Sequence, residues 1–202
     1  MMDKLLKSIS FIFHPLLMPL AGVVFYFAKA PRFIPLDLIK AKLISLFILT
    51  VLLPILMFFL LKTLGKVTTI YLETTKQRII PLFLNCIIIL LIIQKIVPPS
   101  QAVELYFFFV GILISNMACL ILVLFKFKAS IHMIGVNGLL MFIIALSIHF
   151  SININGTLCI MAIIIGAVAT SRLHVNAHNT KELLIGAFIG LIPQLILVPY
   201  WL

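Results

Sequence analysis

The densest run of chemically reactive side chains lies at 171–182, where the chain reads Ser-Arg-Leu-His-Val-Asn-Ala-His-Asn-Thr-Lys-Glu. If this run is helical, His174, His178 and Glu182 recur at four-residue intervals on one face. A carboxylate beside an imidazole fixes its tautomer and supports positive charge on it, as a nucleophilic or basic histidine requires. The same residues also predict the start of a helix, with Asn179 as N-cap and Glu182 three residues later. The run therefore predicts a histidine–carboxylate pair, a capping box, or both.

Two other polar segments carry residue types that suit the same chemistry. Ser130 and His132 precede one apolar run, and Lys76 and Arg78 precede another. Taken singly, each is ordinary, because interfacial histidines are commonly structural and basic residues are common in membrane-protein loops. Together with Arg172 they offer donors for an anion, a nucleophile and a proton donor, which is what phosphoryl transfer requires.

The composition defines the medium in which these residues must be positioned. Of 202 residues, 64% are hydrophobic and 10% are charged, against roughly 45–50% and about 25% in soluble domains. The chain lacks the polar residues that coat a water-facing surface, so we expect a single integral membrane domain over residues 1–202. At about 20 residues for each crossing, no room remains for a separate soluble domain.

The apolar runs predict an all-α transmembrane bundle of six to seven spans. Only helices or closed barrels satisfy the backbone in lipid, and these runs lack the alternation of barrel strands. The first run contains His14, Pro15 and Pro19, so we expect a kinked or partly embedded helix there. We favour a structural role for His14 in that kink. The alternative, if the run crosses fully, is that His14 lines the site at the end where the reactive loops meet. The spans are expected near 9–28, 41–62, 80–97, 105–125, 132–150, 156–170 and 183–201.

The order of the spans brings three polar loops to one membrane face. Loops 63–79, 126–132 and 171–182 are separated from one another by two spans, and two crossings return the chain to the same side. Loops 98–104 and 151–155 fall on the opposite side and contain neither histidine nor a basic residue. We therefore expect the reactive side chains of the first three loops to converge at one end of the bundle.

The charge balance bears on partners. The chain has fifteen Lys and Arg residues and five Asp and Glu residues. The basic residues are scattered between apolar runs, so we expect no nucleic-acid binding. The excess is typical of membrane-protein loops. This excess of positive charge does not decide which membrane face carries the reactive loops, because several of the Lys and Arg residues are candidates for binding phosphate. Cys86, Cys119 and Cys159 lie far apart in apolar runs and predict neither disulfides nor a zinc cluster.

Two of the three loops resemble motifs of the phosphatidic acid phosphatase type 2 and vanadium haloperoxidase superfamily. The third motif of that superfamily is S-R-x5-H-x3-D, and Ser171, Arg172, His178 and Glu182 match it with Glu in place of Asp. The second motif is P-S-G-H, and the run 129–132 keeps its serine and histidine at the same spacing.

The first motif of that superfamily, K-x6-R-P, has a weaker counterpart. Lys76, Arg78 and Pro81 supply its residue types at a broken spacing. The matched stretches keep the superfamily's order and share one membrane face. The resemblance therefore implies a phosphatase-like core at approximately 63–202.

The resemblance also implies a mechanism without metal or cofactor. His178 would attack phosphorus and form a phosphohistidine, Glu182 would orient it, and His132 would protonate the leaving oxygen. The substrate would be a lipid phosphate or diphosphate, and the location a bacterial inner (cytoplasmic) membrane. The residues implied to hold the phosphate are Arg172, Arg78, Ser130, Lys76 and Ser171.

Two other interpretations use the same residues. His174 and His178 have the spacing of paired metal ligands on a helix, and Glu182 or His132 would complete a zinc or iron site. Alternatively, the basic pocket holds a lipid phosphate without hydrolysing it, as in a binding protein or transporter. Oligomeric state has no signal in the sequence.

Overall fold

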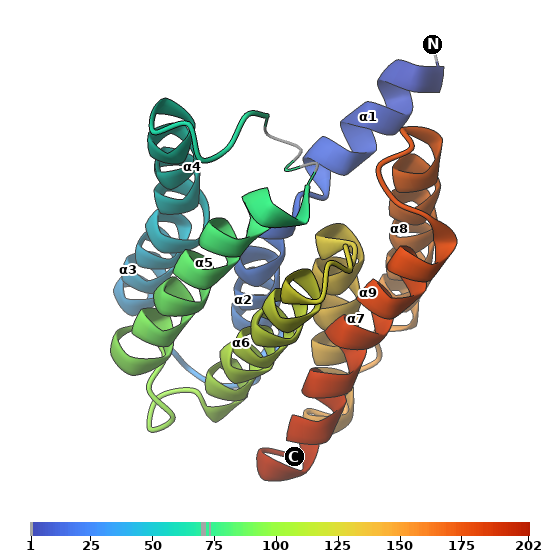
Figure 1. Ribbon diagram of the computed structural model, residues 1–202. Coiled ribbons are helices and arrows are strands. Elements are labelled where there is room, and N and C mark those ends of the chain that lie inside the picture. The colour runs from blue at the N-terminus through green and yellow to red at the C-terminus, as the bar shows by residue number, and fades with distance from the viewer. Residues whose placement is uncertain (1, 70–71, 73) are drawn as a thin grey trace.

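The computed structural model describes residues 2–69, 72 and 74–202, with the side chains of the first helix given from Leu6 onward. This part of the chain is built from helices and loops and contains no strand (Figure 1). Its helices are α1 (Met2–Ile12), η1 (Pro15–Leu17), α2 (Met18–Lys29), α3 (Leu36–Phe47), η2 (Ile48–Leu52), α4 (Leu53–Thr63), α5 (Thr75–Lys95), α6 (Val103–Leu124), α7 (Ile131–His149), α8 (Asn155–His174), α9 (Thr180–Leu197) and η3 (Val198–Tyr200).

The prediction of a polytopic helix bundle is confirmed. Seven helical segments of the described chain are long and apolar enough to cross a membrane. Large apolar side chains on their outer surfaces are exposed, as expected of a protein whose solvent is lipid. The segments are Leu6–Lys29, Leu36–Thr63, Thr75–Lys95, Val103–Leu124, Ile131–His149, Asn155–His174 and Thr180–Tyr200.

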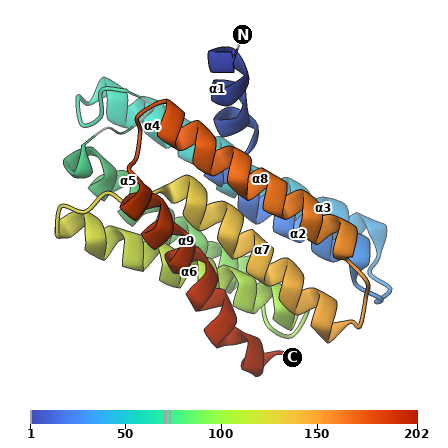
Figure 2. The same ribbon diagram turned by 90° about the vertical axis from the view of Figure 1, so that its right-hand side faces the viewer.

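The first span is kinked, as its prolines predict. Pro15 opens η1 and Pro19 stands in the first turn of α2, where a missing N–H costs little. The chain therefore changes direction between α1 and α2. Helix α2 packs against α7, whereas α1 packs against α8 and projects beyond the rest of the bundle (Figures 1 and 2).

The second span is one long helix with a π-helical turn at its centre. Helix α3 continues through η2 into α4 without a break. Pro54 has no N–H to offer the carbonyl of Thr50, and a π turn is one way in which a helix absorbs that loss. The Thr50 hydroxyl donates to the Leu46 carbonyl (2.8 Å), which satisfies a buried polar group inside the span.

Helices α7 and α9 cross at very short range because glycines line their contact. Gly186 and Gly190 form a G-x-x-x-G pair on α9, a pattern that lets helix backbones approach in membranes. A methyl group on Gly186 would lie 2.7 Å from the Ser130 carbonyl oxygen, and one on Gly190 would lie 2.9 Å from the Gly138 nitrogen. This crossing sets the distance between the start of α7 and the start of α9, where the reactive residues lie.

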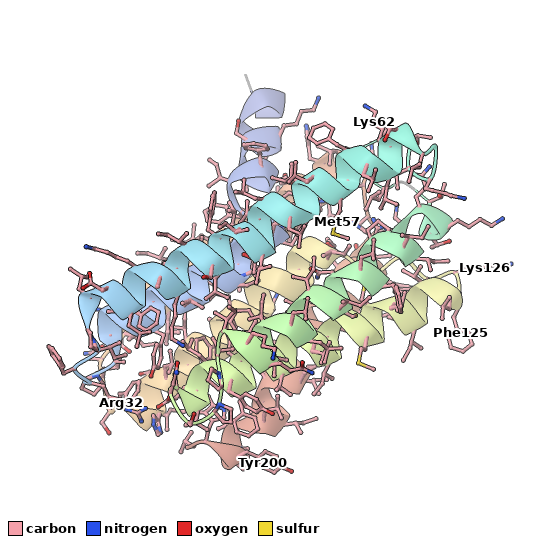
Figure 3. The ribbon with its side chains drawn as sticks, turned by 90° about the vertical axis from the view of Figure 1, so that its left-hand side faces the viewer. Arg32, Met57, Lys62, Phe125, Lys126 and Tyr200 are labelled. Carbon is pink, nitrogen blue, oxygen red and sulfur yellow. The ribbon has the colours of Figure 1, made fainter. Side chains whose placement is uncertain are left out.

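A buried carboxylate holds the opposite end of the bundle together. Glu104 is fully buried and forms an ion pair with Arg32 (2.7 Å). It also accepts a hydrogen bond from the Tyr26 hydroxyl (3.3 Å) and contacts His149 Nε2 at 3.2 Å. Figure 3 shows Arg32 at this end and Lys62 and Lys126 at the other. Both carboxylate oxygens are occupied, so the cluster joins α2, α6 and α7 and leaves no acceptor for a ligand.

Candidate functional site

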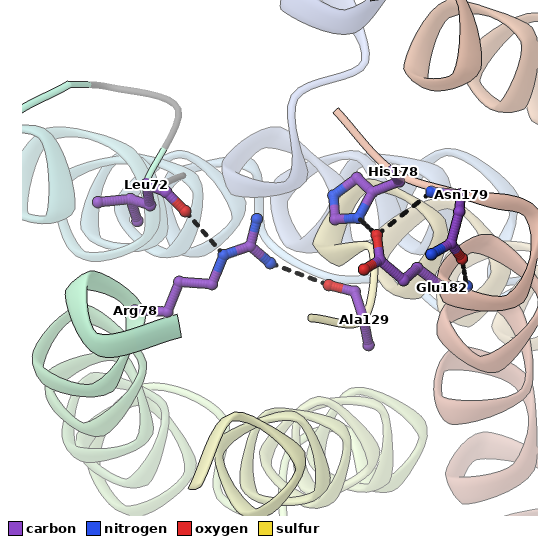
Figure 4. Close-up of polar contacts among 6 residues, drawn as sticks. All are labelled: Leu72, Arg78, Ala129, His178, Asn179 and Glu182. Atoms are coloured by element: carbon purple, nitrogen blue, oxygen red, sulfur yellow. Dashed lines mark hydrogen bonds and ion pairs between the residues drawn. The ribbon is translucent and has the colours of Figure 1, made fainter. Parts of the chain in front are cut away.

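The predicted histidine–carboxylate pair is present at the start of α9. Nδ1 of His178 lies 2.7 Å from Oε2 of Glu182 (Figure 4). The His178 side chain is 2% exposed and that of Glu182 is 16% exposed, so the pair is shielded from solvent. A carboxylate at Nδ1 holds the proton on that nitrogen, which leaves the lone pair on Nε2.

The capping box predicted for the same residues is also present. Oδ1 of Asn179 accepts from the Glu182 amide (2.9 Å), and Oε2 of Glu182 accepts from the Asn179 amide (3.3 Å). One carboxylate oxygen therefore caps the helix and binds the imidazole at once. The two interpretations of Glu182 hold together, because the cap fixes the rotamer that reaches His178.

The condition of a continuous helix through 171–182 is not met, and the run is divided by a helix end and a loop. Helix α8 ends at His174, because Asn176 adopts a left-handed conformation (φ 51°). The amide of Asn176 then donates to the Leu173 carbonyl (3.0 Å), and that of Ala177 donates to the Arg172 carbonyl (3.1 Å), which is the Schellman pattern of helix ends. His174 is exposed and does not share a helical face with His178.

This break removes the geometry on which the metal hypothesis depended. His174 and His178 stand on either side of a helix end instead of one turn apart. Within the described residues, no group of three His, Cys, Asp or Glu side chains is placed to hold a metal ion. The site is built instead from one histidine–carboxylate pair and several cations.

Arg78 and Ser130 reach this site from α5 and from the loop before α7. Arg78 is buried, and its guanidinium donates to the carbonyls of Leu72 and Ala129, both at 3.0 Å. In Figure 4 it points from α5 toward the His178 side of the site. The amide of Ser130 donates to the Glu182 carbonyl (3.1 Å). The Ser130 hydroxyl is buried and has no hydrogen-bond partner within the described residues.

His132 lies in the first turn of α7, two residues after Ser130, and is fixed by the first span. Its Nε2 lies 3.1 Å from the carbonyl oxygen of Ser10. A carbonyl oxygen only accepts, so Nε2 carries a proton and Nδ1 is the nitrogen that remains for a substrate. The His14 ring packs edge-on against that of His132, with centroids 5.4 Å apart.

Arg172 and Ser171 also meet the first span. The Ser171 hydroxyl donates to the Leu6 carbonyl (2.6 Å), so its hydrogen is committed to α1 and not to a ligand. The Ser10 hydroxyl lies 2.6 Å from that of Ser171 and 3.4 Å from a guanidinium nitrogen of Arg172. Ser171 therefore links α8 to α1 by hydrogen bonds. Arg172 supplies positive charge at the end of α8.

Lys76 is the predicted residue that the structure leaves outside the group. It is exposed on the first turn of α5. Its side chain makes no hydrogen bond or ion pair with the described residues. The broken spacing of the first motif agrees with this position, because Arg78, two residues later, occupies the buried side of the same turn.

The electrostatic surroundings favour neutral His178. Burial lowers the pKa of His178 to about 4. The hydrogen bond to Glu182 opposes this shift, and the positive charges of Arg78 and Arg172 add to it. Neutral imidazole is the form that attacks an electrophile, so the same cations that attract an anion keep the candidate nucleophile unprotonated.

The sequence interpretation missed Ser10 and gave His14 a place at the site only as the less favoured alternative. Ser10 contacts His132, Ser171 and Arg172, and His14 was expected to be a structural residue of the kink. The only signal in the sequence was the possibility that the first span crosses fully, which brings its start to the end where the reactive loops meet. The Glu104 cluster was missed as well, because the partners of Glu104 come from α2, the loop after it and α7.

The fold and the site define a helical protein with spans long and apolar enough to cross a membrane, in which arginine and histidine side chains gather at one end. Comparison with family models, with curated proteins and with solved structures finds no match for this chain. Any statement of function therefore depends on the geometry of the site and on the resemblance of its motifs.

Proposed function

We propose that this chain is a membrane lipid phosphatase that hydrolyses a phosphomonoester or diphosphate lipid through a phosphohistidine. The observation that supports this most strongly is the contact of Glu182 with Nδ1 of His178 (2.7 Å). It leaves Nε2 with its lone pair, and Nε2 makes no hydrogen bond with a described residue. A nucleophile oriented by a carboxylate and surrounded by cations is the arrangement that attack on a phosphate monoanion or dianion needs.

The reaction proceeds in two displacements. Nε2 of His178 forms a bond to phosphorus while the bond from phosphorus to the lipid oxygen breaks. Nδ1 of His132, which is unprotonated at rest, takes a proton from the bound phosphate monoanion and delivers it to that oxygen. Water then attacks the phosphohistidine and returns a proton to His132. The P–N bond breaks, His132 passes that proton to the departing inorganic phosphate, and free His178 and neutral His132 result.

The phosphate oxygens are held by donors from three helix ends. Two N–H groups of Arg78 donate to main-chain carbonyls, and its remaining N–H groups are donors for phosphate oxygens in this proposal. The Ser130 hydroxyl is buried with no described partner, and a phosphate oxygen would satisfy it. Arg172 supplies a second guanidinium beside them. Arginine suits this role because its planar fork contacts two oxygens at once.

The position of the site supports a lipid substrate. The reactive residues stand at the ends of apolar spans, so a headgroup there carries its hydrocarbon tail into the bilayer beside the helices. By resemblance, we place the protein in a bacterial inner membrane. No metal or cofactor takes part in this scheme.

The test is phosphate release by the purified protein in detergent from a panel of lipid monophosphates and diphosphates. Wild type is compared with His178→Ala, each with and without EDTA. We expect release by wild type that survives EDTA and falls by roughly a thousandfold or more in the variant. Loss with EDTA would support the metal hypothesis. Lipid binding without release, by folded protein, would support a binding protein or transporter instead.

A further inference from the structure

The kink of the first span places a third histidine at the candidate site. The His14 ring lies 5.4 Å from that of His132, centroid to centroid, in an edge-to-face arrangement. Arg172 is near enough to act electrostatically on both rings. Ser10, one turn earlier in α1, binds His132 and Arg172. The segment 10–14 therefore forms one wall of the site, although it lies outside the stretch that resembles the phosphatases.

The tautomer of His14 follows from its local hydrogen bond. The amide of Leu16 donates to Nδ1 of His14 (3.3 Å), so Nδ1 acts as an acceptor. In a neutral imidazole the proton then sits on Nε2. Nε2 makes no hydrogen bond with a described residue, and it is not among the fully buried polar atoms that lack a partner. This N–H is therefore accessible to a ligand.

We propose that His14 is a substrate-contacting residue, whose Nε2–H donates a hydrogen bond to an oxygen of the bound phosphate. The inference rests on the proposed function, because it uses the same phosphate position between Arg78, Arg172 and His178. A neutral donor suits this wall, since Arg172 already supplies the charge and a second cation beside it would be repelled. Hydrogen bonds to a charged acceptor are stronger than neutral ones, so the contact has a measurable effect on binding.

The simpler role for His14 is to cap the turn after it, and two substitutions separate the two roles. His14→Asn keeps an acceptor near Nδ1, and asparagine is a favoured N-cap residue, but the distal donor is lost. His14→Gln keeps an N–H donor near the position of Nε2 and loses the cap. We expect His14→Asn to raise KM for the lipid phosphate about tenfold or more and His14→Gln to remain within about threefold of wild type.

A second readout makes the inference independent of turnover. The stabilisation of the purified protein by inorganic phosphate is measured as a shift in Tm in detergent, for wild type and both variants. We expect a clear shift for wild type and His14→Gln and a shift reduced by at least half for His14→Asn. The Tm without phosphate reports the loss of the cap itself, which should affect His14→Gln more.

The outcomes distinguish the failure of each proposal. Wild-type affinity for phosphate in His14→Asn, with weak affinity in His14→Gln, would overturn the role of His14 as a donor. Phosphate binding that depends on His14 in a protein that hydrolyses no lipid phosphate would overturn the proposed function and leave the His14 contact standing. Folded wild-type protein that neither binds phosphate nor releases it would overturn both.

Discussion

The carboxylate of Glu182 lies 2.7 Å from Nδ1 of His178 and also accepts the amide of Asn179 at 3.3 Å. One side chain therefore terminates a helix and orients an imidazole. This double use makes it necessary to separate loss of the cap from loss of the chemistry when the residue is changed.

Glu182→Gln is expected to lower kcat at least a hundredfold with a smaller change in KM. The amide keeps the side-chain length but not the negative charge that supports phosphohistidine formation and the Nδ1–H tautomer. The matched control is Asn179→Ala, which removes the other half of the capping box. It should lower the free energy of unfolding by about 1 kcal/mol and leave kcat near wild type. Equal loss of kcat in both variants would mean that Glu182 acts only as part of the helix cap and has no separate role in orienting His178.

The pH dependence of kcat/KM is expected to have its His178 limb near pH 4 instead of pH 6.5. Burial lowers the pKa of His178 to about 4, so the nucleophile stays neutral at pH 5, where an ordinary histidine is largely protonated. Ionisation of the substrate phosphate is measured separately by phosphorus NMR and removed from the profile. An acid limb at pH 6.5 after that correction would contradict the buried, cation-flanked environment of His178.

The same shift predicts a pH-dependent stability. The unfolded chain takes up a proton on His178 at higher pH than the folded protein does. The contribution of neutral His178 to the free energy of unfolding is therefore complete above about pH 6.5 and is lost as the pH falls toward about 4. His178→Asn removes this titration, so the difference in Tm between the variant and wild type should change across this window and stay constant above it.

The α7–α9 crossing is expected to tolerate no side chain at Gly190. A methyl group there would contact main-chain atoms of Ile134 and Gly138, which cannot move aside as a flexible side chain can. Gly190→Ala should lower the free energy of unfolding by about 2 kcal/mol through overpacking. Gly166→Ala on α8 is the control, because nothing lies within 4 Å of its added methyl, and it should be neutral or stabilising.

The Glu104 cluster is expected to serve stability and not turnover. Glu104→Gln removes the charge from a fully buried side chain that pairs with Arg32. The free energy of unfolding should fall by about 2 kcal/mol, since Arg32, Tyr26 and His149 lose a charged acceptor at a fully buried position. The kcat of the folded fraction should match wild type, because the cluster lies at the opposite end from His178. A large fall in kcat at unchanged stability would assign this cluster a part in the reaction.

The sequence predicted the spans well, because length and hydropathy are local properties that the bilayer imposes directly. It also predicted that Ser130, Arg78 and His178 would meet, since counting crossings fixes which loops share a face. The shared helical face of His174, His178 and Glu182, which depended on a helix through 171–182, is absent because Asn176 takes a left-handed conformation that ends α8. Asparagine is one of the few residues that does so readily, so its presence was a signal in favour of a break.

Contacts between helices that are distant in the sequence could not be predicted from the sequence. The bonds of Ser10 to His132 and Arg172 depend on the angle at which α1 leaves the kink, and no local pattern encodes that angle. The Glu104 cluster likewise needs the register of α2, α6 and α7. Lys76 and Arg78 stand two residues apart, and only the rotation of α5 decides that Arg78 faces inward.

The two carbonyl contacts of Arg78 have a consequence for recognition. Its guanidinium is held by Leu72 and Ala129 before any anion arrives, so the rotamer entropy of a long side chain is lost on folding and not on binding. A guanidinium fixed in this way stands at one depth relative to the helix ends. If the proposed function holds, Arg78 therefore selects a phosphate by its height above the hydrocarbon, which is set by how many atoms separate that phosphate from the lipid tail.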